Sequence, residues 1–219
     1  MPLNMFLKAP SSIIDPGETI VLTEDDAVIF HHEAELAPVI GRRAKNVSAQ
    51  NSLEYVFGYT CLIDVSARCA GRGQDLADKS PDTFCPLGPW IVTRDEIPDP
   101  QKLSVRLWVD GVLRQDYNTD DMEHPVSDLI AWTSDVLTLE PGDVLGCGTN
   151  HQGLGPLQDA ETVAMEIERI GRMEFTVRDP LKRRWPVGID RGIGPAVVKL
   201  RCTGVRPPPS ELFSVKRIG

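Results

Sequence analysis

The sequence predicts an α+β domain built mainly of β-strands, with a few short helices. Apolar residues alternate with polar ones in several stretches of the second half, notably residues 105–109, 163–167 and 173–177. Residues 126–137 instead repeat apolar side chains at helical spacing over about three turns. With 219 residues and 41% hydrophobic content, the chain is long enough for one domain with a full core.

The first half of the chain is expected to hold three strands and a short helix. A turn signal at residues 15–17 precedes a short apolar strand at residues 20–22. A longer strand is expected over residues 33–40. Ser48 is then expected to cap a short helix, and residues 58–64 form a second buried strand that ends at an acid.

A β-hairpin is the clearest local prediction in the second half. Three apolar residues alternate with polar ones before Asp110-Gly111, a strong two-residue turn signal, so we expect a hairpin over residues 104–115. Pro125 begins the predicted helix, which is expected to cover a sheet. A short strand is expected at residues 144–147, ahead of the last two alternating segments.

Three acids lie where the two longer strands of the first half begin or end. Glu33 and Glu35 are one residue apart, and a strand points such residues to the same face. Asp64 lies in an apolar setting, where an unpaired carboxylate is costly to bury and a divalent cation would offset the cost. Glu-x-Glu is also a common solvated pattern. Of the adjacent His31 and His32 at most one could face these acids, and neither is assigned as a ligand.

Composition and charge limit the classes of partner. The net charge is −9, yet residues 178–219 carry ten Lys/Arg and three Asp/Glu, so a basic tail follows an acidic body. We expect this tail to contact the body or a neighbouring subunit rather than nucleic acid. Neither a membrane-length apolar run nor a secretory signal is recognised, so a cytoplasmic protein without a membrane partner is expected. The five cysteines lack CxxC spacing, which favours reduced thiols.

Short motifs recur in a fixed order between about residue 6 and residue 177. They are Phe6-Leu7-Lys8-Ala9-Pro10-Ser11-Ser12, His32-Glu33-Ala34-Glu35-Leu36, Gly58-Tyr59-Thr60, Asp64-Val65-Ser66-Ala67-Arg68, Lys79-Ser80-Pro81-Asp82-Thr83, Leu139-Glu140-Pro141-Gly142-Asp143 and Gly148-Thr149. Together they resemble the fumarylacetoacetate hydrolase family, with acylpyruvate hydrolases and 2-hydroxyhepta-2,4-diene-1,7-dioate isomerases as the nearest types. We therefore expect a family-type catalytic domain over residues 1–188 and a basic tail over residues 189–219 outside the resemblance.

The resemblance implies a mixed β-roll or sandwich with few short helices, usually as a homodimer. It implies Mg²⁺ or Mn²⁺ bound through acids that match Glu33, Glu35 and Asp64, and carboxylates are the hard oxygen ligands that suit such ions. Family members act on 2-keto or 1,3-dicarbonyl acids through a metal-stabilised enolate. Hydrolysis of a C–C bond in an acylpyruvate-like keto acid is the leading hypothesis. An isomerase, a decarboxylase or a catalytically impaired metal-binding homologue are the alternatives.

The resemblance also implies roles for residues around the acids. Lys79 would donate to a carboxylate or enolate oxygen of the substrate, and Arg68 would hold a metal ligand or a substrate acid. Thr149 would anchor a substrate carboxylate. Lys8 and His151 are further candidates for the substrate pocket, with a solvated strand end and a capped loop position as the respective alternatives.

Two departures from the family pattern bear on catalysis. Relatives usually carry a segment before the Phe-Leu-Lys motif whose histidine acts with a glutamate to activate water, and we expect this amino-terminal segment to be missing here. Relatives also often have Gln at the position of Gly71, with Gln74 the nearest substitute in this chain. The general base is therefore left unassigned. Cys69 and Cys85 are interpreted as buried, unreactive thiols rather than nucleophiles.

Overall fold

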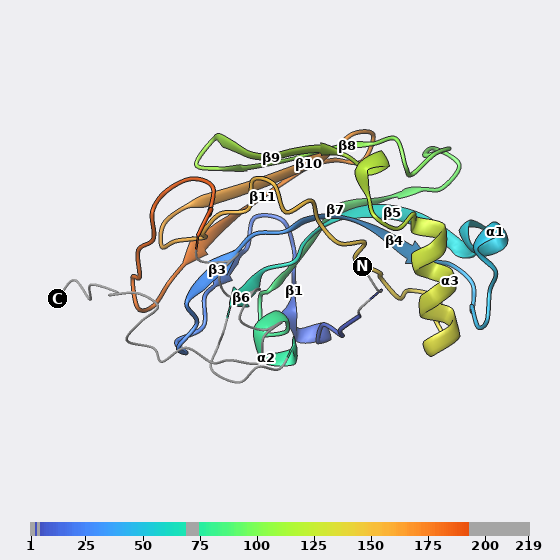
Figure 1. The fold of residues 1–219 in the computed structure, drawn as a ribbon, viewed down its shortest axis with the longest axis horizontal. Helices are drawn as coiled ribbons and strands as arrows, with labels where there is room; N and C mark the ends of the chain where they lie inside the picture. The colour runs from blue at the N-terminus through green and yellow to red at the C-terminus, as the bar shows by residue number, and fades with distance from the viewer. Residues whose placement is uncertain (1–2, 4, 69–74, 193–219) are drawn as a thin grey trace.

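Three β-sheets carry most of the regular backbone in a computed structural model that describes residue 3, residues 5–68 and residues 75–192. The two larger sheets lie one over the other, while α1 and α3 lie together at one end (Figure 1). The α+β class predicted from the sequence is confirmed. Within the described ranges, no helix has the length and apolar character needed to cross a membrane.

Some sequence predictions fall on residues outside these ranges. They concern Cys69, Gly71, Gln74 and the tail from residue 193 onward. The division into a domain over residues 1–188 and a tail therefore stays a prediction.

The four-stranded sheet positions the acids. Its strands run in the order β1 (Ile13–Ile14), β7 (Cys85–Thr93), β5 (Val56–Ile63) and β4 (Ala34–Ile40). Strands β4 and β5 are antiparallel, with Ala34 opposite Ile63. Because Glu33 directly precedes β4 and Asp64 directly follows β5, this register brings the two acids together, and the Asp64 N–H donates to the Glu33 carbonyl at 2.8 Å. The two predicted strands are confirmed to within two residues at either end.

The five-stranded sheet contains the predicted hairpin. Its strands run in the order β2 (Thr19–Val21), β11 (Gly171–Arg178), β10 (Thr162–Ile167), β8 (Ser104–Val109) and β9 (Val112–Asn118). Asp110 and Gly111 have φ angles of 48° and 73°, the left-handed values of a type I′ turn. A bulge in the hairpin then shifts the register, so Gln115 rather than Arg114 lies opposite the buried Leu107. The Gln115 side chain consequently points inward and is fully buried.

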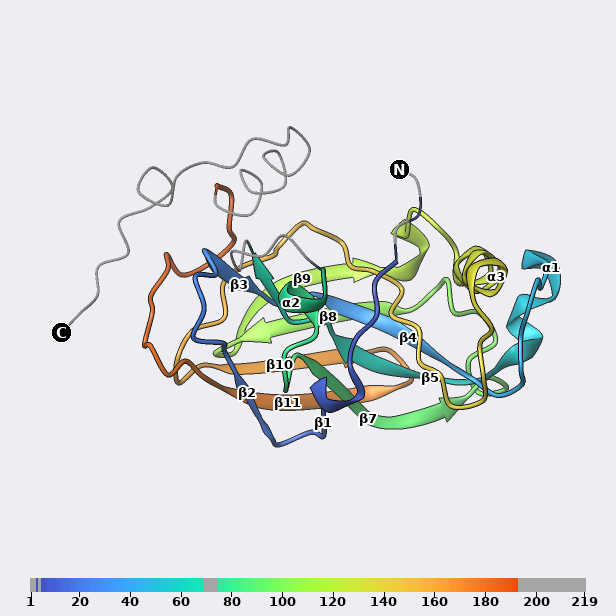
Figure 2. The same ribbon diagram turned by 90° about the horizontal axis from the view of Figure 1, so that it is seen from below.

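A two-stranded ribbon brings further polar residues to the acids. Strands β3 (Ile29–His31) and β6 (Ser66–Arg68) pair antiparallel, with His31 opposite Ser66. Helix α2 (Asp75–Lys79) packs against β6 and ends at Lys79. Figure 1 shows β3, β6 and α2 together below the larger sheets, and β3 and α2 are again neighbours in the view from below (Figure 2).

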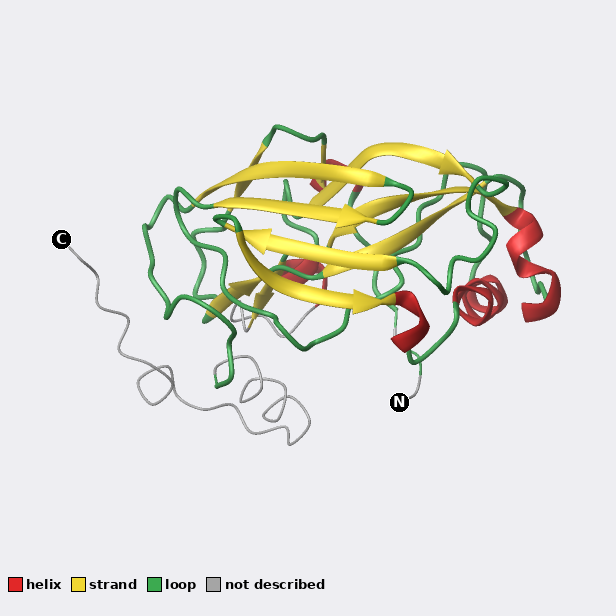
Figure 3. Cartoon of the chain, turned by 90° about the horizontal axis from the view of Figure 1, so that it is seen from above, coloured by secondary structure: helices red, strands yellow, loops and turns green. Residues whose placement is uncertain are grey.

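The apolar core lies between the two larger sheets. Strand β10 packs against β5, β8 against β4, and β11 against β7. Seen from above, the strands of the upper sheet lie side by side, and the helices α1 and α3 lie at one end of the molecule (Figure 3). The fully buried apolar residues include Leu36, Cys61, Leu107, Met165 and Phe175.

Two helix predictions need correction. Helix α1 (Ala49–Ser52) follows Ser48 as expected, but the Ser48 side chain makes no capping hydrogen bond. Helix α3 (Val126–Val136) packs mainly against α1 instead of covering a sheet. Two hydrogen bonds hold α3 beside this region, because Ser134 accepts from the backbone N–H groups of Asn46 and Val47, in the loop that leads to α1.

The predicted strand at residues 144–147 was wrong as regular structure. The segment runs beside β4 and forms one isolated bridge, between Val144 and Val39. The Leu145 N–H donates to the Pro38 carbonyl at 3.0 Å, but Pro38 has no N–H to return, so a regular ladder cannot form.

A substitution at Gly58 tests how closely the paired strands β5 and β7 approach each other. A Cβ at this position would collide with the Val92 carbonyl oxygen. Gly58→Ala is therefore expected to lower the free energy of unfolding by about 1–3 kcal/mol, because backbone has to move. Urea unfolding measures this, with Gly192→Ala as the control, since nothing lies within 4 Å of that position. Equal stability of the two variants would contradict this packing.

Candidate metal centre and active site

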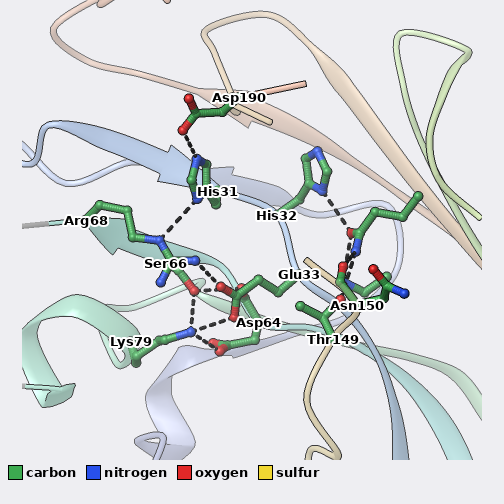
Figure 4. Close-up of polar contacts among 12 residues, drawn as sticks. His31, His32, Glu33, Asp64, Ser66, Arg68, Lys79, Thr149, Asn150 and Asp190 are labelled. Carbon is green, nitrogen blue, oxygen red and sulfur yellow. Dashed lines mark hydrogen bonds and ion pairs between the residues drawn. The ribbon is translucent and has the colours of Figure 1, made fainter. Parts of the chain in front are cut away.

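Glu33, Glu35 and Asp64 converge on one point. One carboxylate oxygen from each lies within 4.8 Å of the others, and the three residues are 5%, 5% and 2% exposed. Strand pairing produces this arrangement, as described above. Among the described residues this is the one grouping of its kind, and it includes neither His31 nor His32. His31 faces Arg68, whereas His32 points to the other side of the strand (Figure 4).

Three cations compensate two of the acids. The Lys79 ammonium lies 2.6 Å from Glu33 Oε2 and also contacts Asp64 (Figure 4). Lys8 lies 2.6 Å from Asp64 Oδ1, and the Arg68 guanidinium pairs with Glu33. The structure thus places Lys79 and Arg68, which were predicted to be catalytic, and Lys8, which was predicted to bind substrate, beside the acids. Their contacts are to the acids themselves, and what they do to a substrate stays a prediction.

Glu35 differs from the other two acids because it has no ion pair among the described residues. Its Oε2 accepts one hydrogen bond, from the Gly148 N–H at 3.0 Å. Burial, together with the charges of Asp64 and Glu33, raises the pKa of Glu35 to about 8. Burial also opposes ionisation of Glu33, but Lys79 and Arg68 outweigh it and hold the pKa of Glu33 well below its usual range.

The donor set fits a divalent cation. Glu35 is buried and has no cation paired with it among the described residues, and one of its oxygens lies within 4.8 Å of oxygens of two further acids. Carboxylate oxygens are hard ligands, which favour Mg²⁺ or Mn²⁺ over softer ions. Such an ion would supply the charge that the protein side chains leave missing at Glu35.

Lys79 is held as a charged donor. Burial alone would lower the pKa of Lys79, but the charges of Glu33 and Asp64 outweigh it and raise the pKa. Ser66 Oγ completes the ammonium's surroundings at 2.5 Å. The Lys79 side chain can therefore stabilise negative charge on a neighbouring oxygen without first gaining a proton.

Gln115, which the sequence analysis did not single out, connects Thr149 to the acid-bearing strand. The Gln115 side-chain amide donates to Thr149 Oγ1 and to the Asn150 carbonyl, both at 2.8 Å. Its oxygen accepts from the Ala34 N–H at 3.2 Å and lies 3.1 Å from His32 Nδ1. Gln115 thus ties the loop that carries Thr149 to the strand that carries the acids.

The remaining candidates lie away from the acids or are unreactive. His151 is exposed in the loop after Thr149, and its carbonyl accepts from the Leu154 N–H at 3.5 Å. The structure does not bring His151 to the acid group, so its part in specificity stays a prediction. Burial raises the pKa of the Cys85 thiol to about 11, which agrees with an unreactive thiol.

Comparison with known proteins identifies the class. Residues 1–178 match the family model described as the fumarylacetoacetate (FAA) hydrolase C-terminal domain. This chain therefore belongs to the fumarylacetoacetate hydrolase family, as its motifs predicted.

One relative of this chain is a hydrolase. The chain is 45% identical over 175 residues to a maleylpyruvate hydrolase of Aquipseudomonas alcaligenes, and the match covers 80% of this chain and 60% of the relative. It thus spans less than two thirds of that relative's length.

Two solved structures share the fold. The first is 5-carboxymethyl-2-hydroxymuconate delta-isomerase from Mycobacterium smegmatis, 45% identical with a TM-score of 0.74 over 80% of this chain and 68% of that one. The second is maleylpyruvate hydrolase from Sphingobium sp. SYK-6 in complex with manganese(II) ion and pyruvate, 39% identical with a TM-score of 0.74 over 80% and 64%. The relatives are thus family enzymes, and one of them was solved with a divalent metal.

Gly146 tests whether Glu35 is a metal ligand. A Cβ on Gly146 would lie 2.5 Å from Glu35 Oε2, so Gly146→Ala should displace the carboxylate while leaving the backbone in place. We expect Mn²⁺ affinity, measured by isothermal titration, to fall by about 10- to 100-fold. Asp135→Asn, a change at an exposed acid on α3, serves as the control. An unchanged affinity in Gly146→Ala would rule out Glu35 as a ligand.

Proposed function

We propose that this chain forms the catalytic part of a divalent-metal-dependent enzyme that acts on a small 2-keto or 1,3-dicarbonyl acid. The leading reaction is hydrolysis of a C–C bond in an acylpyruvate-like substrate. The observation that carries the proposal is the buried acid group in which Glu35 alone lacks a cation. The 45% identity to a maleylpyruvate hydrolase supports the reaction class.

Formal charge in the site favours an anionic substrate. Three carboxylates and the three cations Lys8, Arg68 and Lys79 cancel, so a divalent ion at the acids leaves the site positive. A keto acid carries the complementary negative charge, and its neighbouring oxygens suit an ion that keeps several positions open.

The residues of this chain would share the work of binding and charge stabilisation. Mg²⁺ or Mn²⁺ held by Glu33, Glu35 and Asp64 would supply a Lewis acid for a keto oxygen. Lys79 would donate to a substrate oxygen on which negative charge develops, because its ammonium is fixed and charged. Thr149 would bind the substrate carboxylate, with its hydroxyl oriented by Gln115.

Isomerisation is the second candidate reaction. The 45% identity to 5-carboxymethyl-2-hydroxymuconate delta-isomerase favours it. Hydrolysis and isomerisation differ in whether water has to be activated, and the base for that step is left unassigned. Decarboxylation, or metal binding without any turnover, would be detected in the same turnover assay.

Turnover of candidate substrates tests the proposal. The purified 219-residue chain should consume acetylpyruvate, fumarylpyruvate or oxaloacetate with Mg²⁺ or Mn²⁺, followed by ultraviolet absorbance, and EDTA should abolish the activity. Product analysis separates hydrolysis from isomerisation and decarboxylation. Metal binding without turnover of any of these compounds would instead support the catalytically impaired alternative.

Two variants separate metal binding from substrate handling in the same assay. Glu35→Gln removes a ligand charge, so both Mn²⁺ affinity and turnover should fall. Lys79→Met should keep Mn²⁺ binding and lose about 100-fold or more in turnover, because it removes the charged donor that we propose for a substrate oxygen but none of the three carboxylates. Full activity in Lys79→Met would contradict the role given to this residue.

We also propose that the chain forms a homodimer. Phe57, Trp90 and Ile91 are 52%, 60% and 46% exposed on the paired strands β5 and β7, and a second copy would cover them. Sedimentation equilibrium should give twice the chain mass of 24.2 kDa, and Trp90→Glu should shift it towards the monomer. A monomer at all concentrations tested would contradict the proposal.

A further inference from the structure

Residues 179–192 lie beyond the region that matches the family model, yet they pack against the candidate site. Asp179 and Arg183 form an ion pair at 2.9 Å, and Arg183 donates to the Asp25 carbonyl at 3.0 Å. The Trp185 indole N–H donates to the Val28 carbonyl at 2.7 Å. These contacts anchor the start of the segment beside β3.

Aromatic packing fixes the segment on the strand that carries His31. The Trp185 ring lies edge-on to Phe30, with ring centroids 6.0 Å apart, and Trp185 is 8% exposed. Phe30 is the residue directly before His31. Further along, Gly188 approaches Gly155 so closely that a Cβ on Gly155 would collide with the Gly188 carbonyl oxygen.

Asp190 is the residue that this packing delivers to the site. Its N–H donates to the Leu154 carbonyl at 2.7 Å, which holds the backbone in place. Its side chain is 6% exposed, and Oδ2 lies 2.9 Å from His31 Nε2 (Figure 4).

His31 connects Asp190 to Glu33, one of the candidate metal ligands, through Arg68. The Arg68 Nε–H donates to His31 Nδ1 at 3.1 Å, so Nδ1 has to be the unprotonated nitrogen and Nε2 carries the proton that Asp190 accepts. The same Arg68 guanidinium pairs with Glu33. A continuous chain of contacts thus runs from Asp190 to the acid group (Figure 4).

We propose that Asp190 is a positioning residue for the metal centre. By accepting the Nε2 proton it fixes the tautomer of His31, and that tautomer holds Arg68 against Glu33. Without Asp190, the proton of the neutral His31 ring is free to move to Nδ1. The Nδ1–H would then face the Arg68 Nε–H, so Arg68 would lose this acceptor and its ion pair with Glu33 would weaken. Residues 179–192 therefore complete the site from outside the region matched by the family model. The inference rests on the proposed metal function.

The test compares Asp190→Ala with Asp190→Asn. Alanine removes the acceptor, whereas the asparagine Oδ1 can still accept from His31 Nε2. Asp135→Asn is the matched control, because Asp135 is an exposed acid on α3, and α3 lies at the opposite end of the molecule from β3 (Figure 1). The readouts are the ¹⁵N chemical shifts of the His31 ring at fixed pH without metal, and Mn²⁺ affinity by isothermal titration.

We expect Asp190→Ala to lose the Nε2–H tautomer signature and to bind Mn²⁺ about tenfold more weakly. Asp190→Asn should keep the tautomer and most of the affinity, and Asp135→Asn should match the wild type in both. A role in folding alone would lower the unfolding temperature without changing the tautomer. A wild-type tautomer and affinity in Asp190→Ala would overturn the inference.

The two readouts also separate this inference from the proposed function. If the wild-type chain binds no Mn²⁺, the metal function fails, whereas the His31 shifts still report whether Asp190 sets the tautomer. If the wild type binds Mn²⁺ and Asp190→Ala keeps the tautomer, the positioning role fails alone.

Discussion

The burial of three carboxylates within 4.8 Å of one another is the constraint on which the rest of this structure depends. Like charges at such short range in a medium of low polarity repel strongly, so each has to be compensated. The protein supplies cations for Glu33 and Asp64 from three separate segments, through Lys8, Arg68 and Lys79.

The surrounding polar network keeps this charge arrangement in register. Gln115 joins the acid strand to the loop that follows Gly148, and the Gly148 N–H is the hydrogen-bond donor to Glu35. On the opposite side, His31 and Asp190 hold Arg68. Sheet pairing sets where the acids meet, while these contacts set which oxygens are left without a cation. Among the three acids, Glu35 alone has no ion pair with a described residue, and a divalent ion at the site would supply the missing positive charge.

The sequence predicted the acids and the main strands because both depend on local patterns. Spacing in a strand places Glu33 and Glu35 together, and family motifs pointed to Lys79 and Arg68. The inward position of Gln115 could not be predicted, since it follows from a bulge that shifts the hairpin by one residue. Asp190 gave no signal, because its contact with His31 joins residues 159 positions apart.

Anomalous diffraction from crystals soaked in MnCl₂ tests the central claim most directly. We predict one strong manganese peak for each chain, bonded to oxygens of Glu33, Glu35 and Asp64. Replacement of Glu35 by Gln should remove or weaken that peak while the fold is retained. A peak at other residues, or no peak in crystals whose three carboxylates are ordered and ionised, would contradict the account.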